Sequence, residues 1–225
     1  MPLDLTRIRA ICFDIDGTLS DTDSLWVGRF ERAMQPLQIL LPKQRMHSIA
    51  RRLVMELETP GNLAYEILDR LHLDDEAARL FSLVSRRRKD STGHFLLEAG
   101  IRAMLEELRS RFPLAVVSAR GERSTHSFLE QFDLAPFFRA VATAHTCDHT
   151  KPHPDPLIWA ASQMGVPTDE CLMVGDTTVD IRAGIAAGAQ TTGVLCGFGT
   201  RRELERAGAD LILANTADLS IELLR

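Results

Sequence analysis

Residues 8–18 read IRAICFDIDGT, and this stretch decides the fold. Its first half is apolar with β-branched content, which predicts a buried strand. Its second half is polar, with Asp14 and Asp16 on either side of Ile15 and Gly17 next to them. In an open α/β sheet, ligands bind at the carboxyl ends of the strands. We therefore expect a functional site where this strand ends.

Five further apolar runs predict strands, and helical patterns separate most of them. The predicted strands cover residues 114–118, 140–143, 171–174, 191–195 and 210–213, and the predicted helices cover residues 101–108, 122–131, 156–164, 180–187 and 201–207. Strands that alternate with helices favour right-handed crossover connections. The sequence therefore predicts an α/β fold, with a Rossmann-like parallel sheet as its core and helices covering both faces.

Residues 19–92 break this alternation. They contain no convincing buried strand, and most of them show amphipathic helical patterns interrupted by prolines. We expect them to form an all-helical cap domain, inserted into an α/β core made of residues 1–18 and 93–225. An insert of this kind can cover a site and exclude water from it.

The composition is that of an ordinary globular protein. The chain has 225 residues, 45% of them hydrophobic and 25% charged, and a formal net charge of -5. This charge argues against a nucleic-acid partner, because such binding depends on clustered lysines and arginines. No apolar run approaches the ~18 residues of a membrane span, and the cysteines are scattered without a Cys-x-x-Cys pair. We expect a cytoplasmic protein, monomeric or homodimeric, without a membrane partner.

Three more polar positions lie at the ends of predicted strands or beyond them. Ser118 can donate to an anionic oxygen, as can the backbone N–H groups of the turn that begins at Ala119; capping of the next helix is an equal alternative for Ser118. Lys151 lies in a stiff, proline-rich stretch that can hold its ammonium group in place. Asp176 and Asp180 share a face if a helix begins between them, and the alternative for Asp176 is to cap that helix.

The four aspartates suggest a metal site. Asp14 and Asp16 would face the same way on a strictly alternating strand. Two close carboxylates repel each other, which raises the proton affinity of one unless a cation intervenes. Asp14 can then stay ionised on a divalent metal while Asp16 holds a proton. With Asp176 and Asp180 they provide the oxygen ligands that magnesium prefers. The alternative for the first pair is a solvated Asp-Gly turn.

Three histidines flank Lys151, at positions 145, 149 and 153. Their four-residue spacing would stack them on a helix, which suggests a zinc site. Pro152 and Pro154 exclude a continuous helix, however. We therefore expect no metal site at these histidines.

The order and the flanks of these segments resemble the haloacid dehalogenase superfamily over the whole α/β core. Residues 193–214 are most similar to its phosphoglycolate-phosphatase-like branch, whose cap is helical. The resemblance implies a Mg²⁺-dependent phosphatase that acts on a small phosphorylated metabolite, such as phosphoglycolate or a sugar phosphate.

The resemblance also implies roles for individual residues. Asp14 would be the nucleophile that forms a phosphoaspartate, and Asp16 the general acid and base. The remaining catalytic groups would be Ser118 and Lys151, and the substrate contacts would come from Thr18, Ser118, Ala119 and Lys151. The metal ligands would be Asp14, the backbone carbonyl of Asp16, Asp176 and, directly or through another ligand, Asp180.

Three other activities are compatible with part of this pattern. A phosphohexomutase uses the same aspartates but returns the phosphoryl group to a sugar, and Thr18 after Gly17 favours the phosphatase. A dehalogenase needs no metal, and Asp16 and the pair Asp176 and Asp180 argue against it. A non-catalytic binding protein would not need every catalytic position to be intact.

Overall fold

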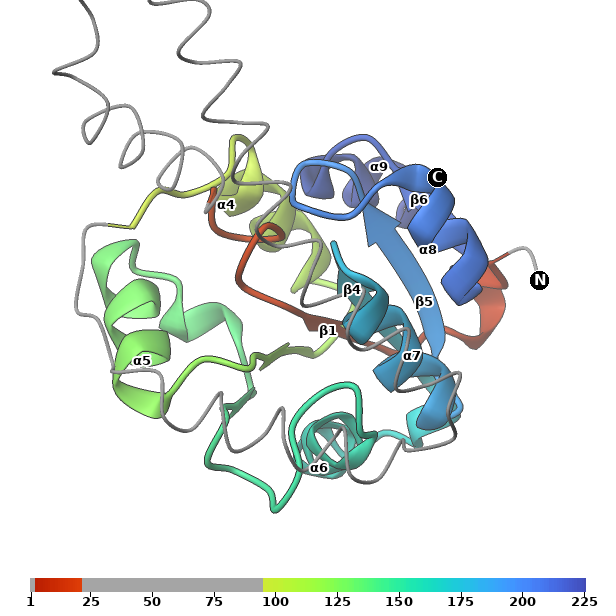
Figure 1. The fold of residues 1–225 in the computed structure, drawn as a ribbon. Coiled ribbons are helices and arrows are strands. Elements are labelled where there is room, and N and C mark those ends of the chain that lie inside the picture. The colour runs from red at the N-terminus through yellow and green to blue at the C-terminus, as the bar shows by residue number, and fades with distance from the viewer. Residues whose placement is uncertain (1–2, 22–94) are drawn as a thin grey trace, which may run out of the picture.

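The core of the protein is one parallel sheet of six strands. A computed structural model describes residues 3–21 and 95–225. The strand order is β3-β2-β1-β4-β5-β6, and every neighbouring pair is parallel. The strands are β1 Ala10–Phe13, β2 Leu114–Val117, β3 Ala140–Ala142, β4 Cys171–Gly175, β5 Gln190–Val194 and β6 Leu211–Leu213. The first strand of the chain therefore lies inside the sheet, between β2 and β4 (Figure 1).

The apolar runs form strands because both faces of the sheet are covered. Every residue of β1, β2 and β4 is buried. Alternate residues belong to different apolar clusters: Ile11 and Phe13 pack on one side of the sheet, and Ala10 and Cys12 pack on the other. A strand buried on both sides reads as a continuous apolar run, and that pattern made the strands predictable.

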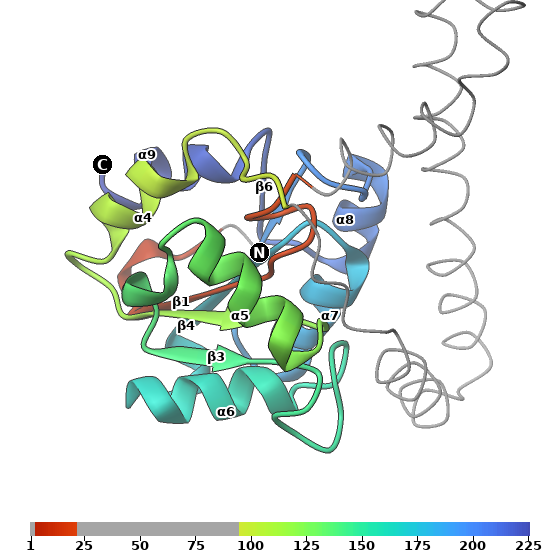
Figure 2. The same ribbon diagram turned by 90° about the vertical axis from the view of Figure 1, so that its left-hand side faces the viewer.

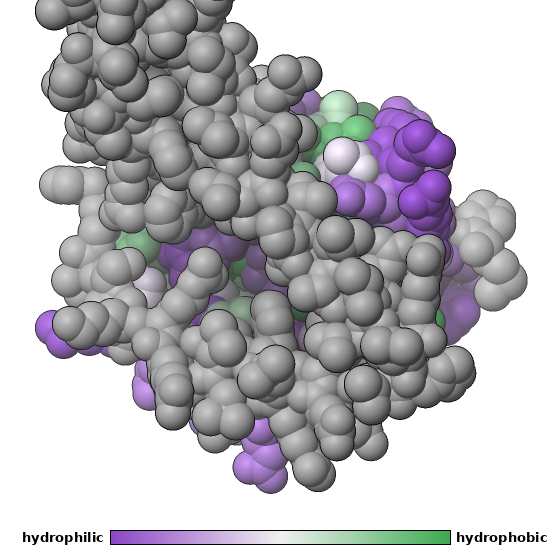
Figure 3. All heavy atoms as spheres, in the orientation of Figure 1, coloured by the Kyte–Doolittle hydropathy of each residue, from purple (hydrophilic) through white to green (hydrophobic). Residues whose placement is uncertain are grey.

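The helices divide between the two faces. They are α4 Ile101–Leu108, α5 Glu122–Gln131, α6 Asp155–Met164, α7 Thr178–Ala186, α8 Arg201–Ala207 and α9 Leu219–Leu223. Helices α4, α5 and α9 contribute to the cluster that contains Phe13, whereas α6 contributes to the cluster that contains Cys12. Figure 2 shows α4 and α9 on one side of the sheet and α6 on the other. Around α8 the surface is strongly hydrophilic (Figure 3), because this helix exposes most of its charged side chains.

The predicted α/β fold is confirmed, with strand and helix ends within about two residues of their predicted positions. Helix α9 was not predicted. No helix of the described residues is long and apolar enough to cross a membrane.

The two segments that border the expected insert lie side by side. Ser20 forms an antiparallel bridge with Leu97. The N–H of Asp21 donates to the carbonyl of Leu96 at 3.0 Å, and the N–H of Glu98 donates to the carbonyl of Leu19 at 3.0 Å. The chain therefore leaves the core and returns to it at adjacent points. The helical cap itself was predicted over residues that lie almost wholly outside the described part, and it stays a prediction.

Candidate active site

Four segments that are distant in the sequence meet at one edge of the sheet. β2, β1 and β4 are parallel neighbours, so their carboxyl ends lie side by side. Asp14, Ser118 and Asp176 are the residues that directly follow these strands. Lys151 comes from the connection between β3 and α6 and reaches the carboxylate of Asp14. The structure thus brings together residues from all four predicted segments.

Lys151 lies between two carboxylates. Its Nζ is 2.6 Å from Oδ1 of Asp14 and 2.6 Å from Oδ1 of Asp180, and only 3% of its side chain is exposed. Burial raises the pKa of Asp14 to about 7; the charge of Lys151 opposes this rise, and those of Asp180 and Asp16 add to it. Burial alone would lower the pKa of Lys151, but Asp14 and Asp180 hold it above its ordinary value. The lysine is therefore charged at neutral pH.

Asp176 is fully buried beneath two turns that contain glycine. Its Oδ2 accepts the N–H of Phe198 at 2.8 Å. A Cβ at Gly17 would come within 2.3 Å of Oδ2, and a Cβ at Gly197 within 2.2 Å, so glycine is what lets both turns approach. Burial raises the pKa of Asp176 well above its ordinary value, and repulsion from the neighbouring carboxylates adds to the rise.

Asp180 serves two partners with its two oxygens. Oδ1 binds Lys151, and Oδ2 accepts the N–H and the hydroxyl of Thr177 at 3.1 and 2.7 Å. The bond from the backbone N–H is one half of a capping box at the start of α7, with Thr177 as the capping residue. The alternative that Asp176 caps this helix is therefore wrong. The cap fixes Asp180 in position and leaves Asp176 facing the other carboxylates.

The hydroxyl of Ser118 accepts the backbone N–H of Arg120 at 3.1 Å. Helix α5 begins after Gly121 and has no side-chain cap, so the alternative of Ser118 as a helix cap is also wrong. Ser118 is buried and the residue after it is half-buried. Thr18 is fully buried, and its hydroxyl lies 3.5 Å from Oδ1 of Asp176. A substrate contact by this hydroxyl stays a prediction.

For Arg120 the sequence favours a solvent-exposed position over a substrate contact, and that interpretation is wrong, because only 13% of its side chain is exposed. Its Nε donates to Oδ2 of Asp16 at 2.7 Å, and its NH2 group binds Oδ1. The guanidinium also lies over the rings of Phe95 and Phe128, with centroid distances of 4.9 and 5.7 Å. Its position two residues after Ser118 places it at the same sheet edge, but the sequence did not indicate its contact with Asp16.

The side chains of Asp14 and Asp16 pair with different basic residues, Lys151 and Arg120. On a strand, side chains two residues apart face the same way, but β1 ends at Phe13, so Asp14 and Asp16 lie beyond this regular pattern. Asp14 is buried against Lys151, whereas 37% of the Asp16 side chain is exposed beside Arg120. The two carboxylates are therefore in different environments, one enclosed and one partly open to solvent.

Three of the carboxylates fit a divalent cation. Oxygen atoms of Asp14, Asp176 and Asp180 lie within 4.8 Å of one another, and all three side chains are buried. Lys151 is the one lysine in the described part of the chain, and one ammonium group does not balance three carboxylates. Protons or a cation must therefore neutralise the remaining negative charge. A set made only of oxygen ligands suits magnesium.

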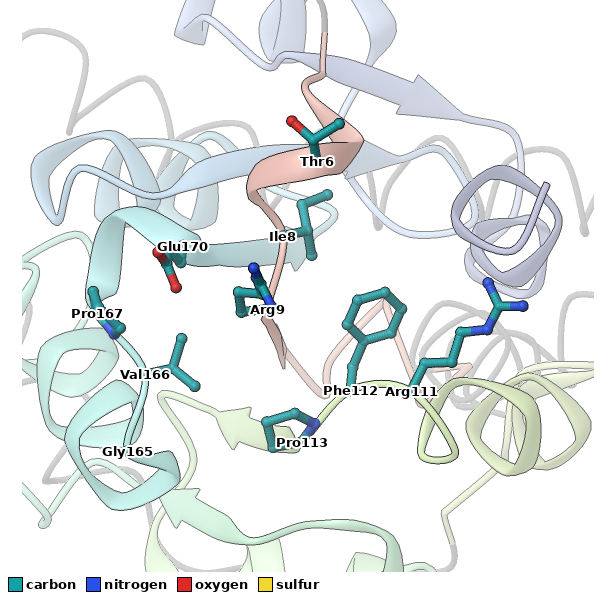
Figure 4. A pocket seen from close by; sticks show the side chains of 10 residues that line it. All are labelled: Thr6, Ile8, Arg9, Arg111, Phe112, Pro113, Gly165, Val166, Pro167 and Glu170. Carbon is teal, nitrogen blue, oxygen red and sulfur yellow. The ribbon is translucent and has the colours of Figure 1, made fainter.

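An open pocket lies at the opposite edge of the sheet, away from these residues (Figure 4). It has a volume of about 590 Å³. Its lining includes Arg9, Pro113 and Glu170, each of which directly precedes a strand. None of the predicted site residues lines it. The pocket is therefore separate from the candidate active site.

The chain belongs to the haloacid dehalogenase-like hydrolases, because residues 11–194 match the model of that family. The match includes the segments that carry Asp14, Ser118, Lys151 and Asp176. The predicted family is thus confirmed, and the protein is a hydrolase of the phosphatase type.

Curated relatives match along almost the whole chain. One is the pyrophosphatase PpaX of Oceanobacillus iheyensis, 27% identical over 216 residues, which cover 94% of this chain and 95% of that protein. Another is the phosphoglycolate phosphatase of Escherichia coli, 25% identical over 232 residues, which cover 94% of this chain and 91% of the relative.

Solved structures share the fold. A hydrolase from Pseudomonas syringae matches with a TM-score of 0.65 and 26% identity, covering 96% of this chain and 97% of the other. A putative beta-phosphoglucomutase from Thermotoga maritima matches with a TM-score of 0.64 and 20% identity, covering 96% and 99%. The second likeness concerns the fold alone.

Proposed function

We propose that the protein is a Mg²⁺-dependent phosphatase that hydrolyses a small phosphomonoester through a phosphoaspartate on Asp14. The observation that carries the proposal is the buried carboxylate of Asp14, paired with Lys151 and grouped with Asp176 and Asp180. Magnesium, when bound to this group, would neutralise the charge of the carboxylates and of the phosphoryl oxygens. This neutralisation would let two anions, the nucleophile and the substrate, approach each other.

In the first step, a carboxylate oxygen of Asp14 attacks phosphorus and the bond from phosphorus to the ester oxygen breaks. Lys151 holds the nucleophile in place and offers a fixed positive charge beside the phosphoryl group. The hydroxyl of Ser118 and the backbone N–H of Ala119 donate to phosphoryl oxygens. Asp16 gives its proton to the leaving oxygen, so that the product departs as an alcohol.

In the second step, water attacks the phosphoaspartate and Asp16 takes up the proton of that water. The bond between Asp14 and phosphorus breaks, and inorganic phosphate leaves. The bidentate contact with Arg120 favours the ionised form of Asp16, which is the form that this step requires. For the first step, Asp16 must loosen its contact with Arg120 in order to carry a proton.

The substrate class is proposed from two lines of support. Curated relatives are named for phosphoglycolate and pyrophosphate hydrolysis, and the site described here offers groups for one phosphoryl group. We propose phosphoglycolate or a sugar phosphate as the type of substrate, and the cytoplasm as its location. No observation in the described residues favours a mutase, which would use a sugar hydroxyl in place of water.

A panel assay tests the proposal. Phosphate release would be measured from phosphoglycolate, several sugar phosphates, pyrophosphate and nitrophenyl phosphate, with magnesium or with a chelator. We expect release from at least one natural ester, dependence on magnesium, and loss of turnover in Asp14→Asn. An amide is isosteric with the carboxylate but far less nucleophilic.

Several results would contradict the proposal. Full activity in the presence of the chelator would show that the reaction needs no metal. An active Asp14→Asn variant would show that Asp14 is not the nucleophile. Conversion of one sugar phosphate isomer into another, without phosphate release, would indicate a mutase. The variant Asp169→Asn serves as the control, because Asp169 is exposed just before β4, at the other edge of the sheet.

A further inference from the structure

Two histidines and an aspartate meet in the connection that carries Lys151. The rings of His149 and His153 are stacked, with centroids 4.3 Å apart and an interplanar angle of 28°. Nδ1 of His149 lies 2.9 Å from Oδ2 of Asp155, and Nδ1 of His153 lies 2.9 Å from Oδ1 of the same carboxylate. All three side chains are about one-third exposed. The cluster is therefore preformed and open to solvent.

The prolines that argued against this arrangement do not prevent it. Pro152 and Pro154 do exclude a continuous helix, as expected. A tight turn replaces the helix, in which the N–H of His153 donates to the carbonyl of Thr150 at 3.0 Å. This turn brings His149 and His153 together as closely as one turn of a helix would. The rings therefore stack without the helix whose absence led to the expectation of no metal site here.

Nδ1 of His153 has a polar neighbour but no hydrogen bond of normal geometry. The atom is buried and has no hydrogen-bond partner among the described residues, although Asp155 is 2.9 Å away. A buried polar atom of this kind calls for a bound ion or a water molecule. The nitrogen of a neutral imidazole can supply its lone pair to a metal.

We propose that His149, His153 and Asp155 bind a divalent transition metal of the zinc type, at a site distinct from the carboxylate group around Asp14. One ligand atom from each of the three residues lies within 4.8 Å of the others. Tetrahedral zinc with bonds of about 2.0–2.2 Å separates its ligand atoms by roughly 3.4 Å, a spacing that lies within this limit. Two imidazoles and a carboxylate leave a fourth position for water.

The ligand types separate this site from the carboxylate group chemically. Imidazole nitrogen suits zinc, nickel and copper, whereas oxygen-only sets suit magnesium. The alternative is a metal-free cluster, in which protonated histidines pair with the carboxylate of Asp155. Asp155 is also stabilised by the helix dipole, because it is the first residue of α6. Two stacked imidazolium rings would repel each other, and one carboxylate cannot offset both charges. One divalent ion satisfies all three side chains at once.

The position of the site gives it a consequence for Lys151. His149 and His153 each stand two residues from the lysine, one on either side. A metal bound to both would link the two ends of the turn, and it would link them to α6 through Asp155. Zinc is therefore expected to raise the melting temperature of the protein, because it binds the folded arrangement and not an unfolded chain.

The test measures metal binding to the full-length chain, stripped of metal and then supplied with millimolar magnesium to occupy the carboxylate group. Zinc would be titrated by calorimetry, and cobalt would be followed by its visible absorption, which reports tetrahedral coordination. We expect one equivalent to bind and the affinity to fall at least tenfold in His149→Ala and in Asp155→Asn. The controls His126→Ala and His145→Ala replace exposed histidines outside the cluster and should bind as the unmodified chain does.

Three further variants locate the ion and measure background binding. The double variant His149→Ala/His153→Ala measures binding at the remaining histidines, at positions 47, 72, 94, 126 and 145, and the same affinity in this variant would overturn the proposal. Loss of zinc in Asp14→Asn or in Cys147→Ser, with binding retained in His149→Ala, would place the ion elsewhere and also overturn it. The readout is independent of phosphatase activity, so an inactive preparation still decides the question.

Discussion

At the scale of single residues, the protonation of the buried carboxylates is expected to control metal binding at the candidate site. The pKa of Asp14 is raised to about 7, and that of Asp176 is raised well above its ordinary value, both chiefly by burial. In the metal-free protein these carboxyl groups therefore hold protons near neutral pH that ordinary carboxyl groups would have lost. A divalent cation has to displace those protons.

Magnesium affinity is therefore expected to rise as the pH increases through about 7. Asp14 ionises over this range, while Lys151 keeps its charge. Calorimetric titrations between pH 5.5 and 8.5, repeated in buffers of different ionisation enthalpy, would show the affinity and the proton release together. The release of protons should be largest at the acid end of this range. An affinity that does not change with pH would contradict the assignment of the metal to this group.

The same shift predicts how stability depends on pH. The folded state binds a proton at Asp14 more tightly than the unfolded chain, whose pKa stays near 3.8. Stability therefore falls as the pH rises from about 4 to 7, because the folded state holds more protons over that window. Urea unfolding of the metal-free protein should show this fall, and Asp14→Asn should reduce its slope. Saturating magnesium should offset the fall by binding the ionised folded state.

The choice of leaving group should separate the two roles proposed for Asp16, general acid in the first step and general base in the second. With nitrophenyl phosphate the leaving group needs no proton, so Asp16→Asn should slow only the second step. Rapid-quench measurements would then show a burst of nitrophenol close to one per enzyme and an added phosphoryl group by intact mass. With an alkyl ester both steps should slow, by about 10²–10⁴ in total rate. Unchanged kinetics on both esters would remove Asp16 from the mechanism, and Asp169→Asn is the control for a charge change elsewhere.

Among the elements, the turn after β1 is tightly constrained at Gly17. Gly17 has a φ of +71° and lies against the carboxylate of Asp176, whereas Gly188 has a φ of +78° and nothing within 4 Å of its Cβ position. The two glycines therefore share a backbone conformation and differ in crowding. This difference makes them a matched pair for substitution.

Gly17→Ala is expected to cost far more than Gly188→Ala. The control should lose about 1 kcal/mol from left-handed backbone strain, whereas Gly17→Ala adds a methyl group 2.3 Å from Oδ2 of Asp176. The first variant should therefore lose magnesium affinity and activity, and the second should keep both. Denaturant unfolding and magnesium titration of the two variants would measure this contrast. Equal losses in both variants would mean that backbone strain, and not the approach to Asp176, is what matters.

Strands β1, β2 and β4 could be predicted from the sequence because they are buried on both faces, so their apolar runs are continuous. Helix α9 has only five residues, Leu219–Leu223, too few for a helical pattern to be distinctive. The contact of Arg120 with Asp16 joins turns after two different strands, and no local pattern encodes such a pairing. The stacking of His149 and His153 depends on a turn whose geometry the spacing of prolines does not fix.

At the scale of the whole molecule, chemistry and substrate choice are expected to reside in different parts of the chain. The α/β core carries the candidate catalytic groups, and residues 19–92 are predicted from sequence to form the cap. Substitutions of Arg29, Arg51 and Arg52, which lie outside the described residues, should change the order of preference in a substrate panel more than the rate on nitrophenyl phosphate. A uniform loss across the panel would indicate a folding defect or a wrong assignment of the cap.

The position of β1 inside the sheet has a consequence for the synthesis of the protein. Asp14 and β1 are synthesised before β2 and β4, the strands with which β1 pairs at Leu114 and Leu172. Contacts between residues so far apart in sequence form slowly, because a long loop must close first. A nascent chain therefore carries Asp14 before β2 and β4 exist and cannot enclose this side chain until β4 has been made. Chains arrested before residue 171 should be inactive, however well their early helices form.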